Sequence, residues 1–214
     1  MRRCWRSWIS LLAVLGTACA AHRPAAAQQA ADAAGLPPAG FGTLRQDQVG
    51  VRLNTPALAI RVLPLDERVI RLLAPDVYRS LSELRTSRAD EIAAAARAAG
   101  QDSATLFIMT FFAVQPQARF NPDDLHLTSQ GAFYRPIGIV PLTSRWSESV
   151  VEQRQQVAAI YLFEPTLAVM RPFSVAYGAA SSGAWEESLR LLGAERARAL
   201  ARAQQRTQPP PPPE

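Results

Sequence analysis

The chain has 214 residues, of which 48% are apolar and 19% charged, and its formal net charge is +5. This length suggests one domain or little more, and the apolar fraction is enough to build a buried core. The two cysteines, Cys4 and Cys19, and the two histidines, His22 and His126, are too few for a zinc cage, an iron–sulfur site or a disulfide scaffold.

The first 27 residues have the order of a secretory signal peptide. Three arginines precede an apolar run over 9–21, whose 13 residues fall short of the ~20 that span a bilayer. Small residues follow at 18–20 and 25–27, as a signal peptidase site requires. We therefore predict that residues 1–27 are a signal peptide and that the mature chain acts outside the cytoplasm, in the periplasm or at the cell surface.

Cys19 leaves open how this leader is processed. A bacterial lipoprotein cysteine follows a Leu, Val or Ile three residues earlier, where this chain has Gly16, although Thr17 and Ala18 fit the other two positions. Lipidation of Cys19 and ordinary cleavage near Ala20 or Ala27 are both compatible with the sequence. Contact with a membrane is expected only through such a lipid anchor.

The positive charge lies mostly in the leader. Beyond residue 27 the chain has 19 basic and 18 acidic side chains, a net charge of +1. A nucleic-acid surface would need a clustered basic patch, so nucleic acid is not an expected partner.

The segments that flank the domain have the composition of linkers. Residues 28–48 are rich in Ala, Gln, Pro and Gly without a period, which predicts a flexible linker. Residues 207–214 contain five consecutive prolines, which favour a stiff polyproline II stub. Such a stub can bind an aromatic groove, but a solvated, disordered tail is the simpler interpretation.

Between these flanks the pattern is mostly β. The strongest strand is 104–114, which is almost wholly apolar and which we expect to be covered on both faces. Short strands separated by turns favour an antiparallel sandwich over a parallel sheet. Strands are predicted at 49–53, 58–63, 104–114, 125–128, 132–135, 137–142, 157–163 and 173–177.

Helices interrupt the strands. The residues Ser87 to Asp90 read as a capping box and Gly100 as a stop signal, which predicts a helix over 88–99. A second helix is predicted over 76–85, and the stretch 66–73 favours a short helix over an edge strand.

The last element is a long helix over 185–205. Apolar residues, among them Trp185 and Leu192, form a stripe along it, with Leu189 and Leu200 at the same spacing. Ion pairs are expected between Glu186 and Arg190 and between Glu195 and Arg198.

The stretch 111–185 resembles the extracytoplasmic immunoglobulin-like sandwich domains of bacterial surface proteins and lipoproteins, most of which have no assigned function. The resemblance covers about a third of the chain. It implies that the turn over 131–136 is structural, with Tyr134 closing one end of the sandwich, and it brings no catalytic residue. The residues that carry it are the apolar run 105–114, FNPDDLHL over 120–127, GAFYRP over 131–136 and AIYLFE over 159–164.

The acids and the histidine do not predict a catalytic or metal site. Asp123, Asp124 and His126 form an acid–histidine cluster, but a turn in which aspartate caps backbone amides explains it better than a metal centre. We expect no catalytic residue, metal or cofactor. Surface charge likewise explains three later glutamates better than paired catalytic carboxylates do: Glu148, Glu152 and Glu164.

Trp146 is the predicted binding residue. It lies alone in a polar loop over 143–155, and exposed aromatic side chains in loops are a common means of recognition. We expect this loop to be a contact surface and Trp146→Ala to weaken partner binding while leaving the thermal midpoint nearly unchanged.

Together these features predict a mainly β chain with helices, an immunoglobulin-like antiparallel β-sandwich with a helical insertion and a C-terminal helix. The predicted function is that of an exported, non-enzymatic binding or interaction module whose partner is a protein or another envelope component. A lipid-anchored structural accessory tethered at Cys19, and an enzyme whose acids converge only in the fold, are the alternatives. The predicted parts are 1–27 signal peptide, 28–48 linker, 49–180 sandwich with insertion 66–99, 181–206 C-terminal helix and 207–214 tail.

Overall fold

The computed structural model describes residues 35–207, and the chain from Leu36 onward forms one unit. The predicted signal peptide, the candidate lipidation site Cys19 and the five prolines of the tail lie outside the described residues. Those three predictions therefore remain predictions.

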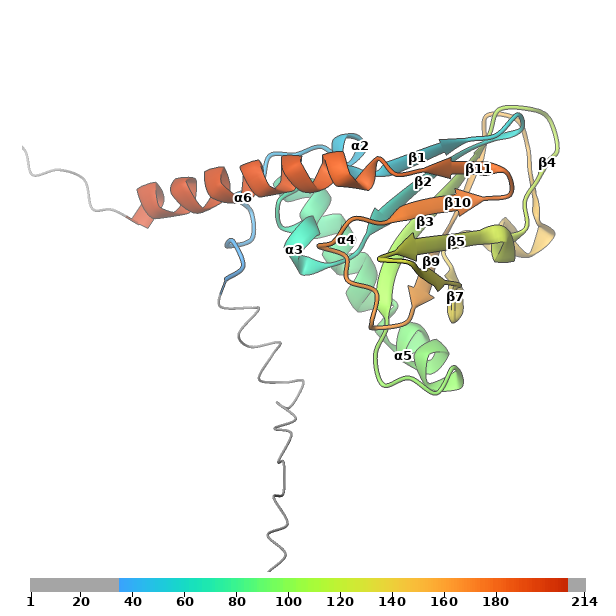
Figure 1. Cartoon of the computed structure of the whole chain (residues 1–214), viewed down its shortest axis with the longest axis horizontal. Coiled ribbons are helices and arrows are strands. Elements are labelled where there is room, and N and C mark those ends of the chain that lie inside the picture. Colours follow the sequence, from blue (N-terminus) through green and yellow to red (C-terminus); the bar gives the residue numbers. More distant parts are fainter. Residues whose placement is uncertain (1–34, 208–214) are drawn as a thin grey trace, which may run out of the picture. The chain divides into compact units, whose positions relative to one another are not determined.

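The described part is mixed α/β, with several antiparallel sheets and a long C-terminal helix (Figure 1). Each of the eight predicted strands is confirmed to within two residues at either end. The strands are β1 Val51–Asn54, β2 Leu58–Pro64, β3 Thr105–Ala113, β4 Ala118–Arg119, β5 Leu125–Ser129, β6 Ala132–Tyr134, β7 Gly138–Pro141, β8 Val150–Val151, β9 Gln156–Phe163, β10 Ser174–Tyr177 and β11 Ala180–Ser182. The helices are α2 Gln46–Val49, α3 Glu67–Ile70, α4 Pro75–Ser87, α5 Ala89–Ala98 and α6 Trp185–Thr207, with 3₁₀ turns η1 Pro122–Asp124 and η2 Ser144–Glu148.

Two sheets share one apolar core. The first has the order β1-β2-β3-β9-β7 and the second β11-β10-β5-β6, and every pairing in both is antiparallel. Aromatic rings join them, since Phe107 meets Phe173 edge-on at 5.6 Å and Phe111 meets Tyr177 at 5.6 Å. Side chains alternate across each strand, so the inner face of each sheet is apolar.

The outer face of the five-stranded sheet is covered at one end only. There α5 contacts β7 and β9, and a Cβ added at Gly138 would lie 3.2 Å from the Cβ of Ala95. The prediction that the strand over 104–114 is covered on both faces is therefore wrong. Phe107, Met109 and Phe111 are fully buried, whereas Phe112 on the outer face is 38% exposed because the helices stop short of it.

The predicted helices are confirmed, but the junction between α4 and α5 differs from the prediction. The stretch 66–73 contains the short helix α3, α4 covers 76–85 and α5 covers most of 88–99. The capping box is wrong, because Ser87 belongs to α4 and its Oγ donates to the carbonyl oxygen of Leu84. The predicted stop signal holds, since Gly100 follows α5 with a φ of +72°.

The helix α6 docks through a stripe that includes polar residues. Trp185 stacks on Phe173 at 5.0 Å, and its Nε1 donates to the carbonyl oxygen of Val169 at 2.8 Å. The predicted pair of Glu195 and Arg198 forms, at 3.9 Å.

None of the helices in the described part combines the length and apolar content that a bilayer span requires.

Phe41 and Thr43 pack against the helix α6, although the composition of residues 28–48 predicts a flexible linker. Glu195 is 1% exposed, and its Oε1 accepts from the backbone N and the Oγ1 of Thr43, each at 2.9 Å, and from Arg202 at 2.5 Å. Arg202 also donates to the carbonyl oxygen of Phe41. These contacts join positions about 150 to 160 residues apart, so the local composition gives no sign of them.

Candidate functional site

Trp146 is a core residue. It lies in η2 and is 7% exposed, with its ring 4.9 Å from that of Phe120, 5.8 Å from Phe111 and 6.0 Å from Tyr161. The prediction that it is exposed is wrong, because the polar residues around it in the sequence form one side of a turn whose aromatic side faces the core. The contacts give Trp146 a packing role and leave it little surface that a partner could reach.

The predicted acid clusters do not assemble into a reactive centre. The predicted turn is present, but Asn121 caps it in place of an aspartate: its Oδ1 accepts from the backbone N of Asp123 at 3.2 Å, and its Nδ2 donates to Asp124 at 2.8 Å. His126 lies on β5 beside Phe133. Glu152 precedes β9 and Glu164 follows it, so the length of that strand separates them. Within residues 35–207 no three His, Cys, Asp or Glu side chains gather in a way that could hold a metal ion.

An uncovered area of the five-stranded sheet is the strongest candidate. Register places its side chains in rows across β1, β2, β3 and β9, all on the outer face. Phe112 and Val114 are 38% and 42% exposed and lie two residues apart on the same side of the chain. We call this area the open face, and it consists of Arg52, Asn54, Ala57, Ala59, Arg61, Thr110, Phe112, Val114 and Gln156.

The open face contains a shallow hollow of about 280 Å³. Its polar lining consists of two guanidinium groups, two amides and one hydroxyl, and Phe112 supplies an aromatic wall. No carboxylate from the described residues lines it. The hollow therefore combines an apolar surface with hydrogen-bond donors and positive charge.

The two arginines of the hollow lie directly opposite one another, on β1 and β2. Like charges in this position repel. Arg52 is partly compensated, because its Nη2 lies 3.8 Å from the Oδ2 of Asp47 and donates to that residue's carbonyl oxygen at 3.3 Å. Arg61 forms no ion pair or side-chain hydrogen bond within the described part of the chain.

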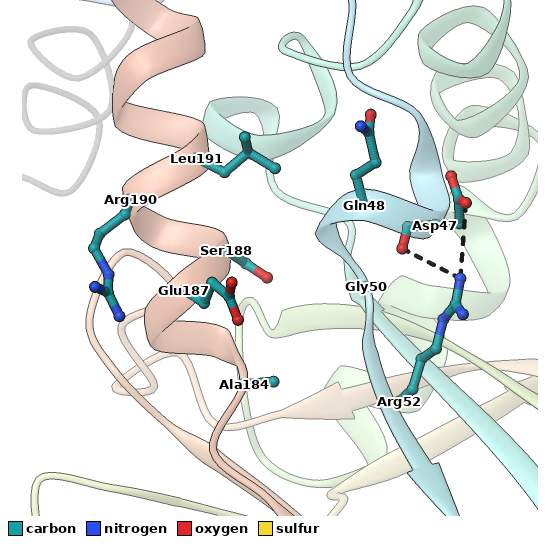
Figure 2. Close-up of a pocket in the computed structure, with 9 residues that line it drawn as sticks. All are labelled: Asp47, Gln48, Gly50, Arg52, Ala184, Glu187, Ser188, Arg190 and Leu191. Carbon is teal, nitrogen blue, oxygen red and sulfur yellow. Dashed lines mark hydrogen bonds and ion pairs between the residues drawn. The ribbon is translucent and has the colours of Figure 1, made fainter.

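A larger, charged cleft of about 620 Å³ adjoins the open face (Figure 2). One wall comes from α2 and β1, the other from the first turns of α6, and Arg52 lines both the cleft and the hollow. Figure 2 shows Ser188 on the side of α6 that faces Gly50. Its Oγ donates to the carbonyl oxygen of Val49 at 3.0 Å, which holds the two walls together.

Among the described residues that line the cleft, no hydrogen bond pairs a nucleophile with a base. Asp47 and Glu187 lie on opposite walls, but the carboxylate of Asp47 is already engaged by Arg45 at 3.2 Å and by Arg52. The Ser188 hydroxyl donates its proton to the backbone carbonyl of Val49, whereas a nucleophilic serine would donate it to a base. The arrangement is suited to binding a charged or polar group.

A second exposed aromatic side chain lies on the other sheet. Phe133 on β6 is 54% exposed, with the ring of His126 at 4.5 Å and the guanidinium of Arg135 at 5.6 Å. It is a single apolar side chain on an edge strand, and isolated exposed apolar residues are normal on protein surfaces. Phe133 therefore serves best as a comparison for Phe112.

Comparisons of the chain with protein-family models, with curated proteins and with solved structures found no match. The resemblance to immunoglobulin-like domains therefore remains a prediction that rests on the residues quoted for it. Function has to be inferred from the geometry of the open face and the cleft.

Proposed function

We propose that the chain is a non-enzymatic binding module that acts outside the cytoplasm and binds another envelope protein through its open face. The observation that carries this proposal is the pair Phe112 and Val114, exposed side by side on a sheet face that the described helices leave uncovered. The signal-peptide pattern of residues 1–27 supports the location.

The open face has the composition of a protein interface. Binding surfaces typically have an apolar, aromatic centre and a polar rim in which arginine is enriched. Here Phe112 and Val114 form the apolar part, and Arg52 and Arg61 border it. Burial of the two apolar side chains would supply association energy, and the arginines would set the specificity.

The loop over 143–155, which the sequence predicts as a contact surface, borders the open face even though Trp146 itself is buried. Gln153 donates from its Nε2 to the carbonyl oxygen of Val114 at 3.3 Å, so the loop borders the open face. Arg145 in turn donates to Gln155 at 2.7 Å. A partner seated on the open face would meet the polar side of this loop.

The immunoglobulin-like architecture is part of the same proposal. Two antiparallel sheets with a shared core support it. The order β1-β2-β3-β9-β7 departs from it, because three successive strands lie side by side where immunoglobulin domains place strands from separate parts of the chain together. The proposed binding role does not depend on which sandwich family the fold resembles.

A lipid-anchored accessory remains the second candidate. Here Cys19 would carry the lipid and residues 20–48 would form a leash, of which the part near Thr43 is held by Glu195. Mass spectrometry of the native N-terminus separates a lipidated Cys19 from a free residue 21 or 28. Either result is compatible with binding at the open face, since the anchor only decides where that face is presented.

Site-directed photo-crosslinking in the cells that make the protein tests the binding role. A photoreactive phenylalanine analogue is placed at Phe112 and, as the matched control, at Phe133. We expect a discrete crosslinked product from position 112 that is absent from position 133, and loss of that product when Val114 is also changed to serine. No product from position 112, or the same products from both positions, would rule out the open face as the binding surface.

A further inference from the structure

The lining of the hollow indicates what kind of group would bind there. Its polar groups are the guanidinium groups of Arg52 and Arg61, the amides of Asn54 and Gln156 and the hydroxyl of Thr110. Guanidinium groups only donate, and amides and hydroxyls can also donate. With no carboxylate in the lining, the negative charge that would satisfy these donors has to come from the occupant.

The position of the two arginines adds to this requirement. Directly opposite residues on antiparallel strands have Cβ atoms about 5 Å apart, so a single carboxylate could accept from both guanidinium groups. Asp47 does not fill that role, because it contacts Arg45 and Arg52 and no ion pair joins it to Arg61. An external carboxylate would relieve the repulsion between the arginines.

The spacing of residues along β3 sets the distance between the two arginines and the apolar part of the open face. Thr110 lies opposite Arg61, and the next two residues on the same side of the chain are Phe112 on β3 and Val114 just after β3 ends. Residues two apart in a strand are separated by about 7 Å. We consider an extended partner segment that lies along β3 and has a carboxylate followed, at alternate positions, by two apolar residues. Such a segment would present its carboxylate to the two arginines and its apolar side chains to Phe112 and Val114.

The size of the hollow favours a protein segment over a free small molecule or a bilayer. About 280 Å³ lies below the range of roughly 300–1,000 Å³ that encloses a drug-sized ligand, but it accommodates one or two side chains. Membrane insertion requires apolar side chains that protrude, whereas Phe112 forms the wall of a recess.

Resting on the proposed function, we infer that the partner contributes an extended acidic segment in which a Glu or Asp is followed at alternate positions by two apolar residues. The carboxylate binds between Arg52 and Arg61, and the apolar side chains pack on Phe112 and Val114. Because Arg52 lines both the hollow and the cleft, the part of the segment that precedes the carboxylate continues into the cleft.

Peptide binding to the purified mature chain tests this inference. The probe is a fluorescently labelled peptide with the core Glu-Ser-Val-Ser-Phe, followed by fluorescence anisotropy. Two control peptides replace Glu by Gln or carry the order Glu-Val-Ser-Phe-Ser, which puts the carboxylate and the apolar side chains on opposite faces. We expect both controls to bind at least about tenfold more weakly. The Gln peptide loses a charge-assisted contact, and the reordered peptide can make either the charged or the apolar contacts but not both at once.

Matched arginine variants locate the site. Arg61→Glu should weaken binding of the first peptide at least about tenfold. Arg171→Glu, an exposed arginine in the segment that follows the opposite end of β9, should leave it within about twofold. Thermal unfolding of each variant establishes that it is folded.

The outcomes separate this inference from the proposed function. If the Glu and Gln peptides bind equally and Phe112→Ser abolishes both, the acidic segment is wrong and the open face stands. If no peptide binds but crosslinking at position 112 succeeds, the segment is again wrong while the binding role stands. Equal losses for Arg61→Glu and Arg171→Glu would show attraction to net charge alone and would overturn the inference.

Discussion

At the scale of single residues, the aromatic cluster between the sheets determines how substitutions act. Trp146→Ala removes a ring that contacts Phe111, Phe120 and Tyr161, so it leaves a cavity in the core. We expect the free energy of unfolding to fall by about 3–5 kcal/mol. Urea denaturation followed by circular dichroism measures this loss, and an unchanged midpoint would show that the ring is not a core group.

Two tyrosines of the same cluster make stability dependent on alkaline pH. The Oη of Tyr161 donates to the carbonyl oxygen of Pro122 at 3.3 Å, and the Oη of Tyr177 accepts from the backbone N of Asn121 at 2.9 Å. Burial is the main cause that raises the pKa of both phenols, strongly for Tyr161. Tyr177 and then Asp123 add to the rise of the pKa at Tyr161.

The sign of the effect follows from proton binding. Above the ordinary tyrosine pKa of 10.0 the unfolded chain loses phenolic protons that the folded chain retains, so stability is full below that pH and falls above it. We expect the thermal midpoint to decrease steadily from pH 10 to 11.5 and the decrease to be smaller in Tyr161→Phe. Melting curves at several pH values measure this, and identical pH dependence in both proteins would contradict it.

At the scale of elements, the approach of the segment before α2 to the end of α3 depends on one glycine. A Cβ added at Gly42 would lie 2.2 Å from the carbonyl carbon of Leu72 and 2.5 Å from the carbonyl oxygen of Leu73, so backbone would have to move. Gly42→Ala should therefore cost about 2–3 kcal/mol.

Gly193 provides the opposite case within α6. Nothing lies within 4 Å of an added Cβ there, and alanine is the better helix former. Gly193→Ala should stabilise the chain by about 0.5–1 kcal/mol. Denaturation midpoints of Gly42→Ala and Gly193→Ala, measured side by side, test the expected loss and the expected gain of stability. A loss of stability in both variants would show that the space around the added Cβ does not decide the effect.

Predictions from sequence succeeded where the signal is local. The strand over 105–113 and the helix over 89–98 are specified by runs of β-branched and aromatic residues or of alanine, and the structure confirms both. The prediction for Trp146 failed because its burial depends on Phe111 and Phe120, which lie on other elements. The open face could not be predicted, since periodicity cannot tell which end of a sheet a helix will cover.

At the scale of the whole molecule, the proposed function places recognition on the face of the five-stranded sheet that is opposite the core. On β3 the residues that face the second sheet are fully buried, whereas Phe112 and Val114 point away from that core. The core therefore tolerates little change, and the outer face can vary. Under the proposed function, the sheet can therefore keep its fold while its binding surface is altered.

This division predicts that stability and binding can be separated by neighbouring substitutions. Phe112→Ser combined with Val114→Thr should lower the free energy of unfolding by only about 1 kcal/mol, because both side chains are partly exposed and the loss is mainly one of strand propensity and partial burial. Phe111→Ala, one position away, should cost about 3–5 kcal/mol. The double variant should nevertheless fail to compete with the wild-type chain in the crosslinking assay, because the apolar surface that a partner would cover is gone. A strongly destabilised double variant would instead mean that these side chains support the fold, and the open face would then lose its claim to be a binding surface.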